Sequence, residues 1–504
     1  MEHYDLIVVG AGSGGLGAAG IARTFGLRTL MIEAEARNVG GDCLNYGCVP
    51  SKSLIHVARL AHAAREAEVY GLEVGGAVSF ERALAHVHAA QARIREHENA
   101  AWLAAQDHQD VVIGWARFTG RRTLAVGGRE YRGERIVLAT GSRARRLDVP
   151  GVDGVRGLHT NHTFFARERP LPRRLLVVGG GAIGCEMAQA MRRLGSAVTL
   201  VDRGDRLLPK ELPRYSRLLE EVFADEGIDV RHGTEVASFR GPSTAVLAPS
   251  GNSSRANRKT DTAADGGAPG ASGEEVAFDE CLVAIGRDES VRDMDLGRAG
   301  VEVDGRGVLR VDDAYRTTNP HVFAVGDAVG REKFSHAAEM HNRDLIVNLL
   351  SPVPLRRHSL ARFSWVTFTD PEVATFGLTA DELDARAIDF ETIDQPFADD
   401  DRAVAGGYAD RAHLTLYVAP GGPGRAARVL GGSMIAPGAG ELVQEWVLAL
   451  QSGATLDDVF HKVYAYPVAS RINQKAAFTY RQGGLGEGAK GAIRWWWRVM
   501  GRLG

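Results

Sequence analysis

Residues 4–34, YDLIVVGAGSGGLGAAGIARTFGLRTLMIEA, decide the fold class of this chain of 504 residues. An apolar run rich in β-branched residues (4–9) leads into a glycine-rich turn. A stretch of small residues with helical character (15–26) follows, and a second apolar run (28–34) closes the unit. This order is typical of two parallel strands joined by a helix. The sequence therefore predicts an α/β protein that begins with a β-α-β unit.

The glycines of the first turn have the spacing of a dinucleotide-binding turn. They are Gly10, Gly12 and Gly15. In such a turn the first glycine permits the tight bend, the second lets a pyrophosphate approach the backbone, and the third lets helix and strand pack closely. Glu33 ends the second strand, where a carboxylate can bind a ribose hydroxyl. The full context of strand, turn, helix, strand and acid favours a nucleotide site over a chance glycine-rich turn.

The same order recurs at residues 173–203, RRLLVVGGGAIGCEMAQAMRRLGSAVTLVDR. The glycines of this second turn are Gly179, Gly181 and Gly184. Asp202 ends the second strand, where a carboxylate binds an unmodified ribose and repels a 2′-phosphate. We therefore expect NADH as the second nucleotide, while Arg203 and Arg206 close by keep NADPH as an alternative.

A third motif, VGGDCLNYGCVPSKSLI at residues 39–55, carries two cysteines. Cys43 and Cys48 are separated by four residues that suit a turn, and Pro50 starts a helical stretch. Cys48 would then lie near a helix N-terminus, where the partial positive charge favours the thiolate. Lys52 follows Cys48 by four residues and could add positive charge to the same site.

Two other interpretations of these cysteines are unrelated buried residues and half of a zinc site. Zinc would require two further ligands, and the sequence has no second paired Cys/His motif, so no metal site is predicted. A close cysteine pair in a reducing compartment is typical of redox chemistry. Cys185 and Cys281 stand alone in apolar surroundings, and we expect both in the core.

The bulk composition excludes several classes of protein. Lys and Arg total 60 against 63 Asp and Glu, a net charge of −3, so nothing favours nucleic acid as a partner. Four cysteines are too few for a secreted scaffold held by disulfides. No signal-peptide pattern precedes the first strand, and no apolar run reaches the ~18–20 residues of a membrane-spanning helix. We therefore expect a cytoplasmic protein.

The length and the pattern along the chain predict several domains, because single cores stop growing near ~250–300 residues. The predicted boundaries are 1–150 with 288–355 for a discontinuous first nucleotide domain, 151–287 for the second, 356–480 for an α+β domain, and 481–504 for a basic, Trp-rich tail. Residues 248–274, rich in Gly, Ser, Ala and Asn, are predicted to form a mobile surface loop.

Further strands and one helix are expected outside the two β-α-β units. Strands are predicted at 111–120, 122–128 and 134–142 in the first domain, and at 364–377, 412–420 and 427–437 in the last, with a helix at 440–453.

With these motifs in place, the chain resembles the pyridine nucleotide–disulfide oxidoreductases, the flavoprotein family that contains dihydrolipoamide dehydrogenase, glutathione reductase and mercuric reductase. The motifs that carry the resemblance are GGDCLNYGCVPSK (40–52), ATGS (139–142), AIGR (284–287), FAVGDA (323–328) and WVTFTDPEVATFGLT (365–379). They occur in the order of the family and run over essentially the whole chain.

The resemblance implies a homodimer with one FAD per subunit, built from two Rossmann-like domains for FAD and NAD(P) and a C-terminal α+β dimerisation domain. It implies that Cys48 is the flavin-facing thiolate and Cys43 the thiol that exchanges with substrate. Lys52 and Glu186 would form an ion pair beside flavin and nicotinamide. Further residues implied at the cofactors are Gly41, Asp42, Ala116, Thr140, Gly141, Ser142 and Asp327 for FAD, and Gly286 for the nicotinamide nucleotide.

The chain departs from the family pattern near its C-terminus. Members that reduce disulfides carry His-Pro-x-x-x-Glu there, and the histidine acts as acid and base for the exchanging thiol. Here the stretch is AYPVASRIN (465–473), with Tyr466 in place of the histidine and Arg471 in place of the glutamate. A tyrosine with a pKa near ~10 is a poor base at neutral pH. Arg471 could bind an anionic substrate or form a salt bridge at a surface or interface.

Mercuric reductases resemble the chain better at this point, because they carry the tyrosine, and DRAVAG (401–406) also resembles them. Those enzymes deliver the metal through a C-terminal cysteine pair, whereas this chain has no cysteine after Cys281. We therefore expect an NAD(P)H-dependent enzyme that passes electrons through Cys43 and Cys48 to a disulfide, to a thiol-bound metal such as Hg(II), or to a similar acceptor. The alternatives are dihydrolipoamide dehydrogenase activity, an electron carrier to quinones or proteins, and a redox sensor that turns over slowly.

The tail combines Lys490, Arg494, Arg498 and Arg502 with Trp495, Trp496 and Trp497. A cationic, tryptophan-rich helix can lie on a membrane surface, and it can equally pack on the body or on the dimer partner. Three consecutive tryptophans cannot all share one helical face, which favours partial burial in protein.

Overall fold

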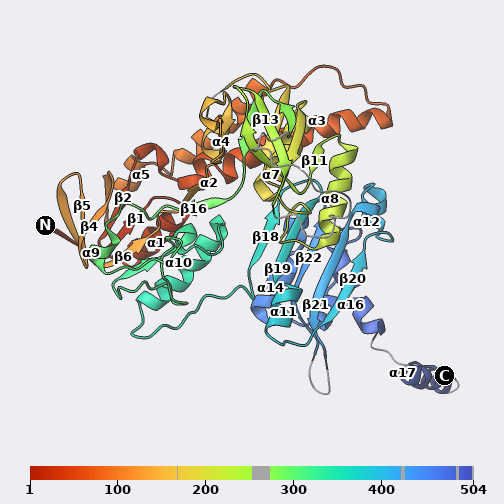
Figure 1. Cartoon of the computed structure of the whole chain (residues 1–504). Helices are drawn as coiled ribbons and strands as arrows, with labels where there is room; N and C mark the ends of the chain where they lie inside the picture. Colours follow the sequence, from red (N-terminus) through yellow and green to blue (C-terminus); the bar gives the residue numbers. More distant parts are fainter. Residues whose placement is uncertain (167, 252–272, 422–425, 484–486, 502–504) are drawn as a thin grey trace, which may run out of the picture. The chain divides into compact units, whose positions relative to one another are not determined.

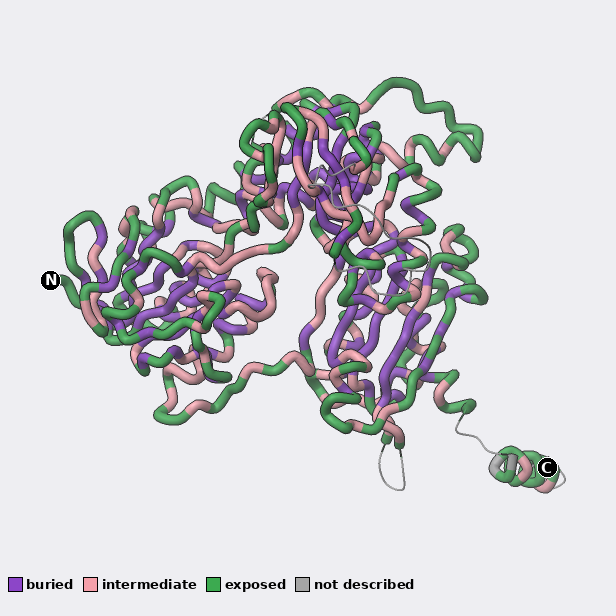
Figure 2. The backbone as a smooth tube through the Cα atoms, in the orientation of Figure 1, coloured by how far each residue is buried: buried purple, intermediate pink, exposed green. Residues whose placement is uncertain are grey.

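The computed structural model describes residues 1–166, 168–251, 273–421, 426–483 and 487–501. The chain separates into two compact units, one of residues 1–209 and 220–358, the other of residues 210–219 and 359–504. Figure 2 shows that buried residues concentrate along the strands of each unit. No helix among the described residues is both long and apolar enough to cross a lipid bilayer.

The first β-α-β unit forms as predicted and lies at the centre of a seven-stranded sheet (Figure 1). Strand β1 (Glu2–Val9) pairs in parallel with β2 (Thr29–Glu33) and β6 (Arg129–Leu138), and α1 (Ser13–Thr24) connects β1 to β2. Strand β17 (Val322–Ala324) returns to pair in parallel with β6, although about 180 residues separate them. This return brings the start of the FAVGDA segment into the sheet that also carries the first glycine turn.

The predicted strand over 111–120 is wrong, because the structure has two strands there. Strand β3 (Gln109–Ile113) pairs with β2, whereas β4 (Arg117–Gly120) pairs with β5 (Thr123–Val126). Gly114 separates them with φ +152°, a conformation that other L-residues rarely adopt, so the extended chain is interrupted at that point.

The second β-α-β unit comprises β9 (Arg174–Val178), α7 (Ala182–Leu194) and β10 (Ala197–Val201). The parallel sheet around it has the order β11-β10-β9-β15-β8, with β11 (Asp229–Arg231), β15 (Glu280–Val283) and β8 (Leu158–His159). An antiparallel sheet of β12 (Thr234–Phe239), β13 (Thr244–Pro249) and β14 (Glu274–Ala277) follows. The ends of the predicted loop 248–274 therefore belong to β13 and β14, and its residues 252–272 lie outside the described residues.

The second unit is built on an antiparallel sheet of order β18-β19-β22-β21-β20. Its strands are β18 (Ser364–Thr367), β19 (Glu372–Gly377), β20 (Glu391–Pro396), β21 (His413–Ala419) and β22 (Arg428–Ala436). The single strand predicted at 364–377 is therefore two strands, with Pro371, which lacks a backbone N–H donor, in the connection between them. The predicted helix at 440–453 is likewise divided, into α13 (Ala439–Leu442) and α14 (Gln444–Ser452).

Helices pack on this sheet around the fully buried Trp446, whose indole N–H donates to Asn473 Oδ1 at 2.7 Å. They include α15 (Leu456–His461) and α16 (Arg471–Gly483), and the C-terminal helix α17 (Glu487–Met500) follows. Residues 210–219 also belong to this unit, since Trp365 Nε1 donates to Glu211 Oε1 at 2.6 Å. The sequence had placed this short segment in the second nucleotide domain.

Candidate active site

Both motif cysteines lie in helices. Cys43 lies in α2 (Gly41–Asn45) and Cys48 is the first residue of α3 (Cys48–Glu66). The turn expected between them is therefore shorter than predicted, because part of it is helical. Asn45 closes α2, since its side-chain amide donates to the carbonyl of Gly41 at 2.9 Å. The N-terminal position of Cys48 is as the sequence predicted.

Two helix N-termini meet at the Cys48 thiol. Helix α10 (Ser335–Leu349) begins at Ser335, whose hydroxyl lies 3.4 Å from Cys48 Sγ. The partial positive charge of a helix N-terminus stabilises an anion, so α3 and α10 both favour a thiolate at this place. Ser335 lies 287 residues from Cys48 along the chain, and no pattern in the sequence pointed to it.

The two cysteines are electrostatically unequal. A hydrogen bond with Cys43, another with Ser335 and the charge of Lys52 together lower the pKa of Cys48 to about 6, although burial acts in the opposite direction. The same hydrogen bond with Cys48, together with burial, raises the pKa of Cys43 far above its usual value. At neutral pH the pair therefore consists of one thiolate, Cys48, and one protonated thiol, Cys43.

Lys52 and Glu186 form the ion pair that the resemblance implied. Lys52 Nζ donates to Glu186 Oε2 at 2.7 Å, and the Glu186 side chain is only 6% exposed. The pair connects α3, which carries Cys48, with α7, which follows the second glycine turn. It therefore places opposite charges where the cysteine motif and the second nucleotide domain meet.

The first glycine turn requires glycine for two physical reasons. Gly10 has φ +104°, and a Cβ there would lie 2.3 Å from the carbonyl oxygen of Ala139. A Cβ on Gly15 would lie 1.7 Å from the carbonyl oxygen of Gly10, so the third glycine permits the close approach of α1 to β1. Glu33 Oε2 accepts a hydrogen bond from the Ala11 amide at 2.7 Å, and burial raises the pKa of Glu33.

The residues expected at FAD surround this turn and fit such a group. Ser142 donates a hydrogen bond to Asp327, and burial raises the pKa of Asp327. The hydroxyl of Thr140 is buried and has no hydrogen-bond partner among the described residues, so a polar ligand atom could satisfy it. Gly141 has φ +70°, and no described atom would contact a Cβ there. Ala116 is buried in the core of the same sheet.

Asp42 is held by residues that sequence reasoning missed. Asn161 Nδ2 lies 3.0 Å from Asp42 Oδ1, His162 Nε2 lies 2.9 Å from it, and the Arg287 guanidinium forms an ion pair at 3.0 Å. Burial raises the pKa of Asp42, but the hydrogen bond with His162 and the charge of Arg287 outweigh it and lower the pKa. Asp42 therefore fixes the cysteine loop as an ionised carboxylate.

The second glycine turn repeats the geometry of the first. Gly179 has φ +114°, and a Cβ on Gly184 would lie 1.8 Å from the Gly179 carbonyl oxygen. Asp202 lies just beyond β10 and accepts hydrogen bonds from the amides of Gly180 at 2.6 Å and Gly204 at 2.7 Å. The carboxylate is thus fixed at the strand end, where a ribose would meet it. Gly181 and Gly286 line the same turn region; Gly286 has φ +111°.

Tyr466 and Arg471 lie together in the second unit. The Tyr466 hydroxyl donates to Asp401 Oδ2 at 3.1 Å, and the Arg471 guanidinium carbon lies 5.3 Å from the centre of the Tyr466 ring. The hydrogen bond to Asp401 raises the pKa of Tyr466, which makes it a still poorer base. Both residues border an open hollow of about 600 Å³ that is also lined by Phe460, His461, Lys462, Val463, Tyr464 and Gln474.

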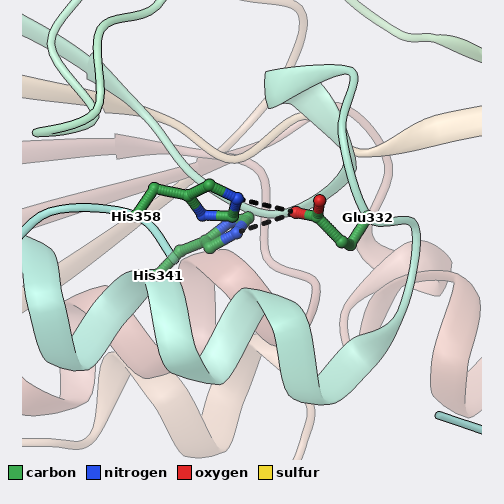
Figure 3. Close-up of side chains that lie close together, drawn as sticks. All are labelled: Glu332, His341 and His358. Atoms are coloured by element: carbon green, nitrogen blue, oxygen red, sulfur yellow. Dashed lines mark ion pairs between the residues drawn. The ribbon is translucent and has the colours of Figure 1, made fainter. Parts of the chain in front are cut away.

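Figure 3 shows a cluster of Glu332, His341 and His358, which the sequence did not predict and in which only His341 is fully buried. The cluster lies beside the FAVGDA segment, since His341 accepts a hydrogen bond from Gly326. Glu332 Oε2 lies 3.8 Å from His341 Nε2 and 3.4 Å from His358 Nε2. Burial raises the pKa of Glu332, but its contacts with the two imidazoles outweigh this and lower the pKa, whereas burial lowers the pKa of His341. The three residues come from a loop, a helix and a later segment, so no spacing in the sequence could have indicated them.

The cluster has the composition of a metal site, but its hydrogen bonds favour a proton on His341. The Gly326 amide donates to His341 Nδ1 at 3.1 Å, so Nδ1 carries no proton and the neutral ring carries it on Nε2. A metal ion on Nε2 would require the proton of the neutral ring to move to Nδ1. Nδ1 could then no longer accept the hydrogen bond from the Gly326 amide. We interpret the cluster as a support for the turn at Gly326, immediately before Asp327.

The remaining cysteines are core residues, as the sequence predicted. Cys185 and Cys281 are fully buried. Burial raises the pKa of Cys185 well above its usual value and raises the pKa of Cys281 to about 12. Neither thiol therefore resembles the reactive pair.

Comparison with known proteins gives a consistent result. Residues 4–342 match the family described as pyridine nucleotide-disulphide oxidoreductase, and residues 363–477 match the dimerisation domain of that family. A dihydrolipoyl dehydrogenase of Thermus scotoductus is 31% identical over 95% of this chain and 97% of its own length. A mercuric reductase of Streptomyces lividans is 31% identical over 95% of this chain and 96% of its own. The solved structure of LpdA from Mycobacterium tuberculosis has the same fold, with a TM-score of 0.80 at 24% identity over 95% of this chain and 100% of its own.

Proposed function

The chain belongs to the pyridine nucleotide-disulphide oxidoreductase family and is an FAD- and NAD(P)H-dependent oxidoreductase, and from this premise we propose that its Cys43–Cys48 pair delivers electrons to a thiol-bound soft metal ion such as Hg(II). The observation that carries this proposal is the inequality of the two thiols, with the pKa of Cys48 lowered to about 6 and that of Cys43 strongly raised. The matched dimerisation domain supports a homodimer.

FAD, when bound, supplies the two-electron exchange between nicotinamide and the cysteine pair. Around it, the turn at Gly12 would receive a pyrophosphate, Glu33 offers a buried carboxylate and Asp327 a half-buried one, and Cys48 presents a thiolate between two helix N-termini. Asp202, fixed by two backbone amides, supports NADH as the preferred reductant.

The two main classes of acceptor, a disulfide and a thiol-bound metal ion, differ in the number of protons that they take up on reduction. Oxidation of the two thiols to a disulfide releases two electrons and two protons. An acceptor disulfide takes up both and leaves as two thiols, so it requires an acid for the departing sulfur. Hg(II) takes up two electrons to become Hg(0) and needs no proton itself, and soft thiolates bind such ions well.

Tyr466 therefore supports the metal acceptor over the disulfide. It stands where the disulfide-reducing relatives carry histidine, and its hydrogen bond to Asp401 raises its pKa further. Exchange with lipoamide or glutathione would lack its usual acid and base. Dihydrolipoyl dehydrogenase activity is the second candidate, because relatives of that name align over nearly the whole chain.

Anaerobic titration of the FAD-loaded enzyme with NADH, and separately with NADPH, tests the electron path. A long-wavelength absorbance band after two electrons, reporting a thiolate beside oxidised flavin, is the expected result. Direct bleaching without that band would exclude the cysteines from the path and favour an electron carrier. NADH should produce the band at lower concentration than NADPH.

Steady-state assays then identify the acceptor among thiol-bound Hg(II), lipoamide, oxidised glutathione and a water-soluble quinone. Cys43→Ser should lower the Hg(II)-dependent rate by roughly 10³-fold or more, the usual consequence of removing a reacting nucleophile. Cys281→Ser, which changes a fully buried thiol in another sheet, is the control and should retain activity. Full quinone reduction by Cys43→Ser without any Hg(II) activity in the wild type would contradict the proposal.

A further inference from the structure

Helix α17 (Glu487–Met500) has a distribution of side chains that the electron-transfer function does not use. Lys490, Arg494 and Arg498 are spaced by four residues, so they form one stripe along the helix. Ile493, Trp496 and Met500 are spaced by three and four residues and form a second stripe, centred about 130° around the helix axis from the first. The match to the family model of the dimerisation domain ends at residue 477, so this helix lies outside the matched residues.

The three tryptophans occupy different parts of the apolar side. Successive residues of a helix are rotated by about 100°, so Trp495 and Trp497 flank Trp496 on either side. Each flanking indole thus lies between the apolar centre and the basic stripe. The apolar arc from Trp495 through Trp496 to Trp497 is about 200° wide. All three tryptophans can therefore contact the same apolar surroundings if these surroundings enclose more than half of the helix.

These apolar side chains are exposed in the described structure, and Figure 2 colours much of the backbone near the C-terminus as exposed. The exposed fractions of Ile493, Trp495, Trp496, Trp497 and Met500 range from 51% to 80%. The partial burial in protein that the sequence favoured is therefore not found within one chain. Large apolar surfaces left in water are unfavourable and mark a site of contact.

We propose that α17 lies in the headgroup layer of an anionic membrane, parallel to its plane. The apolar arc would face the acyl chains, the flanking indoles would lie at the boundary where tryptophan is favoured, and the basic stripe would meet lipid phosphates. A helix of 14 residues is about 21 Å long, shorter than the ~30 Å hydrocarbon core, so it lies on the membrane and does not cross it.

The width of the apolar arc favours a membrane over a protein groove. A groove receives a helix through a narrow face defined by residues three and four apart. An arc of about 200° would require a protein to wrap around most of the helix, whereas a fluid lipid layer surrounds it without a preformed shape. The three cations on the remaining arc fit anionic headgroups by charge.

Flotation of the FAD-loaded, full-length enzyme with lipid vesicles tests this proposal independently of any electron acceptor. The enzyme should float with vesicles of phosphatidylcholine containing phosphatidylglycerol, and much less with phosphatidylcholine alone. Binding should fall as salt is raised from ~50 mM to ~500 mM, because charges near the surface are screened. Replacement of Trp495, Trp496 and Trp497 by alanine should weaken binding at least roughly tenfold.

A charge-reversed variant and its control distinguish the effect of the basic stripe on vesicle binding from the effect of the net charge of the protein. Arg494→Glu with Arg498→Glu should weaken vesicle binding roughly 10- to 100-fold, whereas Arg362→Glu with Arg386→Glu, which changes two exposed arginines elsewhere in the same unit, should not. Reduction of a soluble dye by NADH should be unchanged in every variant and shows that each one folds. Absence of wild-type flotation, or loss of the dimer in the tryptophan variant on sedimentation, would overturn the proposal and assign α17 to a contact between copies of the chain.

Discussion

The Cys43–Cys48 pair and the two isolated cysteines, Cys185 and Cys281, carry the same thiol in opposite surroundings. Cys48 lies at the N-terminus of α3 and contacts Ser335 at the start of α10, with Lys52 adding positive charge. Cys185 and Cys281 lie inside a helix and a strand of the second nucleotide sheet, where burial alone raises the pKa of Cys281 to about 12. Nearby hydrogen-bonding and charged side chains, together with exposure, distinguish the reactive thiol from the structural ones in this chain.

Counting reactive thiols should give the largest contrast between the two regions. In the NADH-reduced, folded protein, a chromogenic disulfide reagent should react with two of the four thiols, because Cys185 and Cys281 are fully buried and protonated. We expect the motif cysteines to react roughly 10³-fold or more faster than the two buried cysteines. All four thiols should react in denaturant. Rapid reaction of three or four thiols in the folded protein would remove the contrast.

Much of the reactive region could be predicted from the sequence because its signals are local. Pro50 and the pattern after it place Cys48 at a helix start, and Lys52 follows one turn later. The spacings of Gly10, Gly12 and Gly15 likewise indicate the turn without knowledge of the fold.

The partners that tune and hold this region could not be predicted, because they are distant in sequence. Ser335 lies 287 residues from Cys48, and His162 lies 120 residues from the Asp42 that it binds. The first contact depends on the return of residues 288–355 to the first domain, and the second contact depends on how the second domain folds against the first. The prediction of one continuous strand over residues 111–120 failed for a different reason. The sequence shows a glycine at position 114 but does not show that its φ is positive.

Replacing Lys52 tests how much its positive charge contributes to the difference between Cys48 and the buried cysteines. Lys52→Met removes a positive charge that lowers the pKa of Cys48, so the Cys48 pKa should rise from about 6 by roughly one unit. Cys48 is the anion above its pKa, so the long-wavelength band should disappear as the pH falls through about 6 in the wild type, and at a higher pH in the variant. Spectrophotometric pH titration of the two-electron-reduced enzyme measures both midpoints.

Lys475→Met, at a half-buried lysine in the second unit, is the matched control and should leave the midpoint unchanged. A midpoint near 9 in the wild type would mean that the helix termini and Lys52 do not stabilise the thiolate, and the contrast with Cys185 and Cys281 would then rest on exposure alone.

Replacing Ser335 tests the support from the second helix, because it removes one hydrogen bond to Cys48 and leaves both helices in place. Ser335 Oγ lies 3.4 Å from Cys48 Sγ and lowers the pKa of Cys48 less than the hydrogen bond with Cys43 does, but more than the charge of Lys52 does. Ser335→Ala should therefore raise the midpoint by at least as much as Lys52→Met, roughly one unit. Ser359→Ala, at an exposed serine outside the site, controls for the loss of a hydroxyl. If Ser335→Ala shifted the midpoint less than Lys52→Met, the lysine and not the hydroxyl would be the main external support of the thiolate, and the site would depend on α3 more than on α10.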